Sequence, residues 1–551
     1  MMTSALLHNI THWLSKLSAL LIATTTLSAC LNEDTRDRLG SDETYADASS
    51  LMLNTVATLY NYIGGHEESQ GLQGTYNGVY DLNTFTTDEA MLPTRGGDWY
   101  DGGWWQSLYL HSWKPRDTPF YNTWCYLYKV IMLCNSSLET LKAHESMLTT
   151  AQYQEATAEV RGLRAMYYFY AMDLFGNIPL VTDSRAKLSD VAQVPRSQTF
   201  NFVYDELRDV APYLNEAHSN QQNNYYGRFT RPVAYFLLAK LALNAEIYSD
   251  DNWTDGRQPQ GNSIMLEADG RKLNAWQACI TWCDKLKEEG YKLANDYASN
   301  FSIHNETSEE NIFIIPMDKY LYTNQYQYLF RTRHYKHGGA LGMDAENGTC
   351  APLSAVEAYG YGTDSLDNRY SINFSSDTLR IDGKVVTLDD GTPLVYDPLA
   401  VRLDLKNSPK EKTAGARMAK YETDRQAFLD GKLQSNDIVL FRYADVVLMR
   451  AEAMARDGQD AAPYLNEIRA RVNMPDRKAT LDNILKERLL EMMWEGWRRN
   501  DLIRFGLFHK AYDQRPQQAN EEKGYTTVFP IPQRVLDLNH LLKQNPGYPT
   551  E

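Results

Sequence analysis

The sequence predicts a mostly α-helical protein, in which paired helices form a scaffold that carries long irregular loops and a few short β-strands. Three observations lead to this fold class. Long segments place apolar residues at helical spacing, the stretches between them are rich in Gly, Pro, Asn, Asp and Tyr, and β-like runs are short. The 551 residues are enough to bury several hydrophobic cores.

The clearest helix is expected over Gln154–Gly176, where Leu163, Tyr167 and Leu174 share one face and Gly176 marks the end. Further segments with helical spacing begin at Pro232 and occupy Leu440–Arg456 and Asn483–Trp497, and shorter helices are expected at Thr199–Leu214 and Ala461–Val472. Neighbouring helices this close in sequence would pair antiparallel, in the manner of tetratricopeptide repeats. The sequence has no clean period of about 34 residues, however.

The remaining stretches are expected to be irregular: residues 62–120, 250–275, 300–430 and 513–551, with short β-like runs such as Ile312–Ile315 and Lys384–Leu388. Loops of this length inside a compact protein are usually functional. No obvious linker separates independent domains. We therefore expect a helical scaffold on one side with large loops laid across the other.

Composition excludes several classes of function. A net charge of −16 offers no cationic surface for nucleic acid, and 43% hydrophobic with 23% charged residues is typical of a folded soluble body. The common zinc-protease, nucleophile-elbow, phosphate-loop and EF-hand motifs are missing from the sequence. Asp88 and Glu89 are adjacent, a pattern more typical of a solvated turn than of a catalytic pair. Cys279 and Cys283 share a helix face without further ligands, which indicates buried thiols and no zinc site.

The chain begins with a segment typical of an export signal. The apolar run Leu17–Leu27 is too short to cross a bilayer and ends in Leu27-Ser28-Ala29-Cys30, which resembles the lipobox of bacterial lipoproteins. Residues 1–29 are therefore expected to be removed and Cys30 to be lipidated. Several acyl chains on one residue give stable anchoring where one would be marginal.

Aromatic residues with a polar edge are abundant, with 37 Tyr and 11 Trp against 17 Phe. Residues 93–105 concentrate rings, glycines and charges in one loop, in which the candidate ligand-binding residues are Arg95, Asp98, Trp99, Tyr100, Trp104 and Trp105. Glycines let the backbone turn sharply and present large side chains outward. An indole face flanked by hydrogen-bonding groups suits a sugar ring, with its apolar face and hydroxyl rim. Packing as a lid on the helical core remains the alternative for any individual ring.

A second tyrosine-rich stretch, residues 320–328, is the candidate facing wall of such a site. Its alternating tyrosines fit equally well a single strand with a buried tyrosine face.

Six segments taken together resemble the SusD/RagB family of outer-membrane nutrient-binding lipoproteins. They are the signal ending at Cys30, AEVRGLRAMYYFYAMDLFGNIPL at 158–180, VLFRYADVVLMRAEAMA at 439–455, LNEIRARV at 465–472, ILKERLLEMMWEGWRRNDLIRFG at 484–506 and VFPIPQRVLDLNHLLKQNPGY at 528–548. They occur in the family's order and span nearly the whole chain after the signal. The resemblance divides one SusD-like unit, residues 30–551, into halves at about 30–310 and 311–551.

The resemblance implies a protein that is not an enzyme. No cofactor is expected and no residue is assigned as a metal ligand, while the sequence does not identify whether a metal ion binds. Such proteins face outward from the outer membrane, tethered by lipid, and form a hinged lid over a SusC-like TonB-dependent transporter barrel, to which they deliver captured oligosaccharide or peptide. In glycan-binding members a loop after a T-D-E segment carries platform aromatics, and Thr87-Asp88-Glu89 precedes Trp99 here. Asp318, Tyr320 and Tyr322, after another matching segment, are second-rank candidates.

The sequence therefore favours capture of oligosaccharide or polysaccharide by aromatic stacking. Peptide capture, as in the RagB branch, is the leading alternative. Peptide binders hold their ligand through main-chain bonds and need no ring platform, so the Trp-rich loop favours sugar. A glycosidase is the third possibility and would require two carboxyl groups about 5–10 Å apart beside the rings.

Overall fold

The computed structural model describes residues 45–549 except 66, 321–330 and 428–432. The chain divides into two compact units, Met1–Asn54 and Thr55–Glu551. In the described part of the first unit, α3 (Ala48–Met52) begins after Asp47, whose carboxylate accepts a hydrogen bond from the backbone N–H of Ser50 at 2.8 Å. All that follows concerns the second unit.

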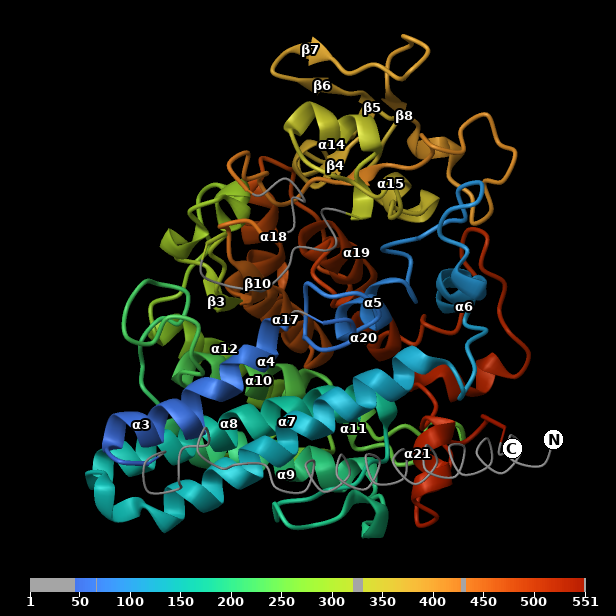
Figure 1. Ribbon diagram of the computed structural model, residues 1–551. Helices are drawn as coiled ribbons and strands as arrows, with labels where there is room; N and C mark the ends of the chain where they lie inside the picture. Colours follow the sequence, from blue (N-terminus) through green and yellow to red (C-terminus); the bar gives the residue numbers. More distant parts are fainter. Residues whose placement is uncertain (1–44, 66, 321–330, 428–432, 550–551) are drawn as a thin grey trace, which may run out of the picture. The chain divides into compact units, whose positions relative to one another are not determined.

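The second unit is built mainly from helices (Figure 1). They are α4 (Thr58–Gly64), α5 (Val79–Thr84), α6 (Trp104–Leu110), α7 (Thr118–Ala143), α8 (Thr150–Phe175), α9 (Arg196–Val210), α10 (Arg231–Leu243), α11 (Ala245–Tyr248), α12 (Ala275–Glu288), α14 (Tyr335–Leu341), α15 (Leu353–Ala358), α16 (Tyr370–Asn373), α17 (Tyr443–Arg456), α18 (Ala462–Arg471), α19 (Leu481–Met492), α20 (Arg498–Arg504) and α21 (Gln533–Leu538). The predicted class, mostly α with helical hairpins, is confirmed.

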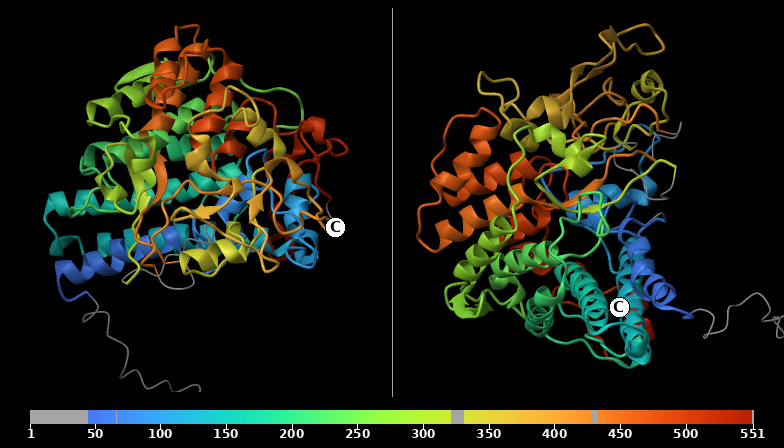
Figure 2. Two further views of the ribbon diagram at one scale, coloured as in Figure 1. Left: turned by 90° about the horizontal axis from the view of Figure 1, so that it is seen from above. Right: turned by 90° about the vertical axis from the view of Figure 1, so that its left-hand side faces the viewer.

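Consecutive long helices pack on each other: α7 on α8, α8 on α9, α10 on α12, and α12 on α17, which also contacts α18 and α19. Figure 2 shows these helices side by side from two further directions. Residues 345–420, which include α15, lie at the other end of the second unit, beside α14 (Figure 1). No helix in the described ranges combines the length and apolar character needed to span a membrane.

Local chemistry explains where the helices begin and end. A capping box begins α8. The Thr149 hydroxyl accepts a hydrogen bond from the backbone N–H of Gln152, and the Gln152 side-chain oxygen accepts one from the backbone N–H of Thr149. The helix ends at Gly176, which has φ +73° and no room for a Cβ because the Trp253 ring is 2.5 Å from that position. The predicted helix at 154–176 is confirmed, while α7 was not anticipated.

Two predicted helices have different bounds. Residues 438–442 are the strand β10 (Ile438–Arg442), paired antiparallel with β3 (Asn311–Ile315), so α17 starts only at Tyr443. The α19 helix ends at Met492, and Trp494 then adopts φ +68°, a conformation that no α-helix continues through. The periodic pattern alone could not reveal either boundary, because both flanking segments are apolar and buried.

The described strands form five two-stranded antiparallel sheets. Besides β3 with β10, these pair β1 (Met265–Ala268) with β2 (Arg271–Asn274), β4 (Phe374–Ser375) with β9 (Arg417–Met418), β5 (Asp377–Thr378) with β8 (Val395–Tyr396), and β6 (Arg380–Ile381) with β7 (Lys384–Val385). The run predicted at Lys384–Leu388 is thus only two residues of strand. The β3–β10 pair is buried along its whole length, so it belongs to the core.

A fully buried carboxylate, Glu491 on α19, joins segments that are distant in sequence. It accepts ion-paired hydrogen bonds from Arg442 Nη1 at 2.6 Å, from Arg369 Nη1 at 2.8 Å and from Arg471. Arg442 also pairs with Glu310, which precedes β3, at 2.7 Å. This buried network therefore holds β10, α18, α19 and the loop before α16 in one arrangement.

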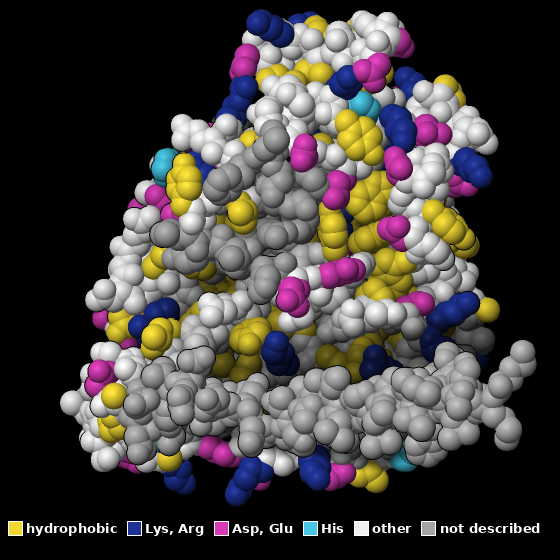
Figure 3. Space-filling model, viewed as in Figure 1, with side chains coloured by type: hydrophobic (Ala, Val, Ile, Leu, Met, Phe, Trp, Pro, Cys, Tyr) yellow, Lys and Arg dark blue, Asp and Glu magenta, His cyan; other side chains and the backbone are white. Residues whose placement is uncertain are grey.

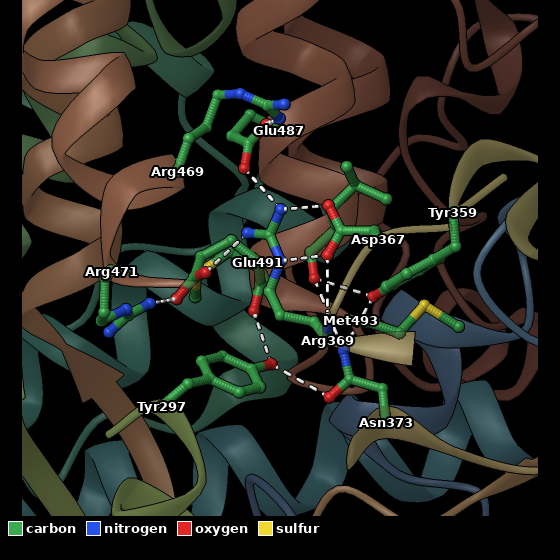
Figure 4. Close-up of polar contacts among 12 residues, drawn as sticks. Tyr297, Tyr359, Asp367, Arg369, Asn373, Arg469, Arg471, Glu487, Glu491 and Met493 are labelled. Carbon is green, nitrogen blue, oxygen red and sulfur yellow. Dashed lines mark hydrogen bonds and ion pairs between the residues drawn. The ribbon is translucent and has the colours of Figure 1, made fainter. Parts of the chain in front are cut away.

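Figure 4 shows how the network continues around Arg369. Its Nη2 contacts Asp367 at 2.8 Å and Glu487 at 2.6 Å, and Glu487 in turn pairs with Arg469. The Tyr297 hydroxyl donates to Asn373 at 3.0 Å. Every charge in the cluster has an opposite partner, the condition under which buried ions are tolerated.

A second buried network connects the helices themselves. Lys240 on α10 pairs with Asp445 on α17 at 2.6 Å, and Arg488 on α19 lies 2.8 Å from both Asp445 and Asp501. Packing of these four helices, including α20, is therefore specified by charge as well as by apolar contact.

The adjacent pair Asp88–Glu89 is not the solvated turn that the sequence suggested. Glu89 is buried and accepts a hydrogen bond from the backbone N–H of Trp494, while Asp88 takes two bonds from Arg498, at 2.6 and 2.7 Å. Desolvation raises the pKa of Glu89 to about 8, although that N–H and the charges of Lys420 and Arg498 oppose the shift. The two carboxyl groups are structural anchors.

Replacing Glu491 by Gln is expected to lower the free energy of unfolding by about 3–5 kcal/mol, because three buried guanidinium groups would lose a shared carboxylate. Burial opposes ionisation of Glu491, yet the charges of Arg471, Arg442 and Arg369 hold its pKa well below the ordinary value. Urea denaturation at neutral pH measures the change. The control is Glu467→Gln on the exposed side of α18; equal effects of the two substitutions would contradict a central role for Glu491.

The raised pKa of Glu89 predicts a pH dependence of stability. The protonated side chain is stabilising below the ordinary value of 4.5, and this contribution is lost as the pH rises through about 8. Glu89→Gln keeps the acceptor for the Trp494 N–H but cannot ionise. The variant's free energy of unfolding should therefore increase relative to the parent between pH 4.5 and 8, measured by denaturation at each pH, whereas the exposed Glu522→Gln should follow the parent.

Candidate functional site

The aromatic loop of residues 93–105 leaves the interior through a tight turn. Met91 bridges to Cys350, Thr94 bridges to Asp404, and the chain reverses between Arg95 and Asp98. Beyond the turn Trp99, Asp101, Gly102 and Gly103 all have positive φ, between 42° and 88°. Only glycine adopts this region without strain, so the two glycines let the chain enter α6 directly after the loop.

Arg95 anchors this turn from inside the protein. Its side chain is fully buried and donates to three backbone carbonyls: Nε to Gly348 at 3.0 Å, Nη1 to Glu411 at 3.0 Å and Nη2 to Ala414 at 2.9 Å. Desolvation lowers its pKa to about 9. The sequence placed Arg95 beside the ligand, but its donors are occupied by the loops that it holds together.

Trp105 is also interior, with 3% of its surface exposed. Its ring packs edge to face on Phe85 and Trp99, and its Nε1 donates to Asp101 at 2.7 Å. The Arg331 guanidinium lies 5.3 Å from its ring centroid. Trp105 is thus a support for the loop, in line with the alternative of a lid on the core.

The Arg331 guanidinium supports the neighbouring rings from below. It makes two bonds to Asp81 on α5, at 2.7 and 2.8 Å, and its guanidinium lies 4.9 Å from the ring centroid of Tyr76 and 4.8 Å from that of Phe85. Nothing in the sequence singled out Arg331, because its partners are about 250 positions earlier in the chain.

Three of the four predicted rings reach the surface. Tyr100 is 60% exposed, and Trp99 and Trp104 are half-buried. The indole N–H of Trp99 donates to the Glu346 carbonyl at 3.0 Å and that of Trp104 to Asn77 Oδ1 at 2.7 Å. Because both N–H groups are bonded within the protein, what the indoles offer to solvent is carbon surface.

Two further tyrosines join these rings. Tyr76 lies edge to face with Trp99, at 6.4 Å between centroids, and Tyr335 at the start of α14 donates from its hydroxyl to Asp98 at 3.2 Å. We call the set formed by Tyr76, Trp99, Tyr100, Trp104 and Tyr335 the ring cluster. Tyr76 stands between glycines in the sequence, as the loop rings do, and this is the signal that could have revealed it. Tyr335 carries no such signal.

Polar groups lie at the edge of the ring cluster. The predicted site residue Asp98 is exposed and pairs with Lys412 at 2.8 Å, and Glu346 accepts a hydrogen bond from the Tyr76 hydroxyl. The hydrogen bond from Lys412 lowers the pKa of Asp98, so this carboxylate is ionised at neutral pH. On the face drawn in Figure 3, hydrophobic side chains gather over α15 and between α5 and α6, with acidic side chains among them.

The second-rank candidates are described only in part. Asp318 is half-buried and accepts a hydrogen bond from the backbone N–H of Tyr320, whose side chain is 74% exposed. Tyr322 lies outside the described residues, as does most of the tyrosine-rich stretch, so neither of its two interpretations is decided. The first described residue after this stretch is Arg331, beneath the ring cluster.

Cys30 also lies outside the described residues. Cys279 and Cys283 are buried free thiols, as predicted, whereas the thiol of Cys125 is exposed. Within the described ranges no three His, Cys, Asp or Glu side chains are grouped to hold a metal ion.

Two family models match the chain: "SusD family" over residues 401–548 and "Starch-binding associating with outer membrane" over residues 48–243. The chain is similar to the starch-binding protein SusD of Bacteroides thetaiotaomicron, 24% identical over 524 residues that cover 87% of each protein. It is also similar to a SusD-like protein of Bacteroides ovatus, 21% identical over 520 residues, which cover 87% of this chain and 86% of that protein.

Solved structures agree on the fold. A laminarin-binding SusD-like protein has a TM-score of 0.67 at 20% identity, covering 91% of this chain and 100% of its own. Surface glycan-binding protein A of Bacteroides thetaiotaomicron, solved with laminarihexaose, has a TM-score of 0.68 at 18% identity, covering 91% and 99%. Both halves of the sequence, the relatives and the fold agree, and the chain belongs to the SusD-like family.

Proposed function

We propose that this protein captures glycan at the cell surface through the ring cluster and passes it to a transporter. The observation that carries the proposal is the exposure of Tyr100, Trp99 and Trp104 beside a polar edge, on a loop fixed from within by Arg95. Relatives whose names record binding of starch and laminarin support the same class of ligand.

Stacking would supply the affinity. A pyranose ring presents an apolar face, and the carbon surface of the indoles and of Tyr100 is available to meet it. Because the loop is held by buried hydrogen bonds, little conformational entropy is lost on binding. A few rings together with a few hydrogen bonds give roughly −4 to −8 kcal/mol, a millimolar to micromolar affinity that permits release.

The edge of the cluster would supply hydrogen bonds to sugar hydroxyls. Asp98 accepts, Lys412 donates, and the Tyr335 hydroxyl, whose proton goes to Asp98, can accept. The charges of Asp98 and Lys412 compensate each other and Glu346 adds a further carboxylate, so the edge matches a neutral polyhydroxyl better than an anionic ligand. We propose Asp98, Trp99, Tyr100 and Trp104 as ligand contacts, with Arg95 and Trp105 as their supports, and Asp318, Tyr320 and Tyr322 as a second group.

The geometry favours binding without catalysis. A glycosidase needs one carboxyl group that keeps its proton near neutral pH, opposite a second carboxylate. The Lys412 ammonium instead holds Asp98 ionised, and Asp101 accepts the indole N–H of Trp105. Both carboxylates accept hydrogen bonds within the protein, as does Glu346 from the Tyr76 hydroxyl.

The site of action would be the outer membrane, with the protein tethered through lipid on Cys30 and facing outward. One matching family model is described as "Starch-binding associating with outer membrane", and this description supports the location. We further propose that the captured glycan passes to a SusC-like TonB-dependent barrel, for which weak, reversible binding is the appropriate affinity.

Tyr100→Ala is expected to weaken glycan binding about tenfold, because loss of one stacking ring removes roughly 1.4 kcal/mol. Affinity gel electrophoresis with laminarin and with soluble starch in separate gels measures the effect. Tyr100→Phe should bind like the parent, since it keeps the ring face. Tyr213→Ala is the matched control, because Tyr213 is 52% exposed and lies outside the ring cluster.

Other outcomes would redirect the proposal. Equal retardation of the parent and Tyr100→Ala would place the glycan elsewhere. Binding of a mixed peptide digest that Tyr100→Ala abolishes, with no retardation by either glycan, would favour peptide capture. Release of reducing ends from laminarin or starch above the buffer blank would overturn the assignment as a non-enzyme.

Cys30→Ala is expected to abolish incorporation of an alkyne fatty acid during growth and to release the protein from the outer-membrane fraction, because no other residue would carry the anchor. Click labelling and fractionation provide the two measurements. Cys125→Ala, which removes an exposed thiol, should change neither. Labelling that survives Cys30→Ala would contradict the proposed anchor.

A further inference from the structure

An open pocket lies on the loop between the short helix Ala211–Tyr213 and α10, and it shares no residue with the ring cluster. Its volume is about 460 Å³, within the range of about 300–1,000 Å³ that is typical of small-molecule sites. Four of its lining residues carry side-chain amides: Asn215, Gln221, Asn223 and Asn224. His218 and Tyr225 add two rings to the lining.

The loop that forms this pocket is held in place by its own hydrogen bonds. The backbone N–H of Gly227 donates to the Ser219 carbonyl at 2.7 Å and that of Arg231 to the Asn215 carbonyl at 2.8 Å. The Asn220 amide donates to the Ser308 carbonyl at 2.7 Å. The pocket is therefore preformed, and a ligand would not have to order the chain around it.

Both rings of the lining are fixed by groups on one side. The Tyr225 hydroxyl donates to Glu155 on α8 at 2.6 Å, and the Arg228 guanidinium lies 4.8 Å from the ring centroid. His218 stacks on the buried Tyr291, with 4.1 Å between ring centroids and 13° between ring planes. A ligand in the pocket would meet the opposite faces of these rings.

Both arginines around the pocket are already occupied by carboxylates. Glu216, the carboxylate of the lining, pairs with Arg231 at 2.8 Å, and Arg228 donates to Glu159 at 2.9 Å. Arg231 also pairs with Glu289, at 2.7 Å, so two carboxylates share this guanidinium. Neither arginine is therefore left for an anionic ligand.

The amides provide what a hydroxyl-rich ligand needs. Asn215 Oδ1 accepts from the Ala217 N–H at 2.9 Å, and Asn223 is bonded through both of its polar atoms, to Tyr225 N and to the His218 carbonyl. Among the described residues the Asn224 amide and Asn215 Nδ2 have no partner, so a donor and an acceptor remain available. Each sugar hydroxyl both donates and accepts, and amides pair with it in either sense.

We infer that this pocket is a second saccharide site, which binds one or two neutral sugar units between amides and two ring faces. A bound peptide would need a strand edge or an extended groove for its main chain, and the lining here comes from a single turn of loop. The site is independent of the proposed capture at the ring cluster.

Saturation-transfer difference NMR tests the inference with four neutral pyranoses, glucose, galactose, mannose and xylose, each in excess over the mature protein. The protein carries Tyr100→Ala so that the ring cluster contributes little. We expect at least one sugar to give a signal, and Asn224→Ala combined with Tyr225→Ala to reduce that signal about tenfold, because a hydrogen bond and a stacking ring are lost.

Further variants keep the result decisive if loss of Tyr225 disturbs folding. Asn224→Trp changes only an exposed side chain and should block the pocket, while Gln222→Ala, which is exposed and outside the lining, should bind like its parent. The inference is overturned if none of the four sugars gives a signal that Asn224→Trp removes. It is also overturned if glucuronate, which is anionic, gives a stronger signal than every neutral sugar.

Discussion

The pairing of buried arginines with buried oxygens determines how this protein is built. In the described part of the chain, ten arginines are among the largest fully buried side chains, including Arg442 and Arg369 on the carboxylate of Glu491. Long irregular segments bring many carbonyl groups into the interior, and each needs a donor. One guanidinium offers five N–H groups in a rigid fork, so it can serve several carbonyls or carboxylates at once. A helix satisfies its backbone carbonyl groups with its own N–H groups. In the loops of this protein, arginine side chains donate the hydrogen bonds that buried carbonyl groups need.

The same interaction links the scaffold to the candidate binding surface. Arg95 bonds three carbonyls from two distant segments, and Arg331 pairs with Asp81 while it lies against the rings above it. Neither residue touches solvent to any extent that would let it meet a ligand. The loop of residues 93–105 can therefore be irregular in its backbone and still hold its aromatic side chains in fixed positions. Such preorganisation is what allows a small number of stacking contacts to give useful affinity.

Hydrophobic periodicity predicted the helices whose bounds depend on local sequence. It failed where contacts with residues distant in sequence decide the secondary structure or the burial of a side chain. The helix over residues 150–175 follows from its apolar spacing and its capping residues. The first residues of Leu440–Arg456 look equally helical, but pairing with β3 makes them a strand. Glu89, beside Asp88, was expected to be solvated. It is buried instead, where it accepts a hydrogen bond from the backbone N–H of Trp494, about 400 positions later. Arg95 and Trp105 carry the residue types of a binding site, and only the packing of remote loops shows that they are supports. Tyr335 and Lys412 were not predicted as site residues for the same reason. Spacing along the chain gives no information about groups that the fold brings together from distant positions.

The inward bonding of the two indole N–H groups has a consequence for specificity. With those donors committed to Glu346 and Asn77, Trp99 and Trp104 have no directional bond with which to tell one hydroxyl configuration from another. Discrimination by hydrogen bonding would then fall to the charged and hydroxyl groups around them, while the rings require only that the sugar present an apolar C–H face. Substitution of two or three side chains at the edge of the ring cluster could therefore change the preferred carbohydrate during evolution, while the aromatic rings stay the same.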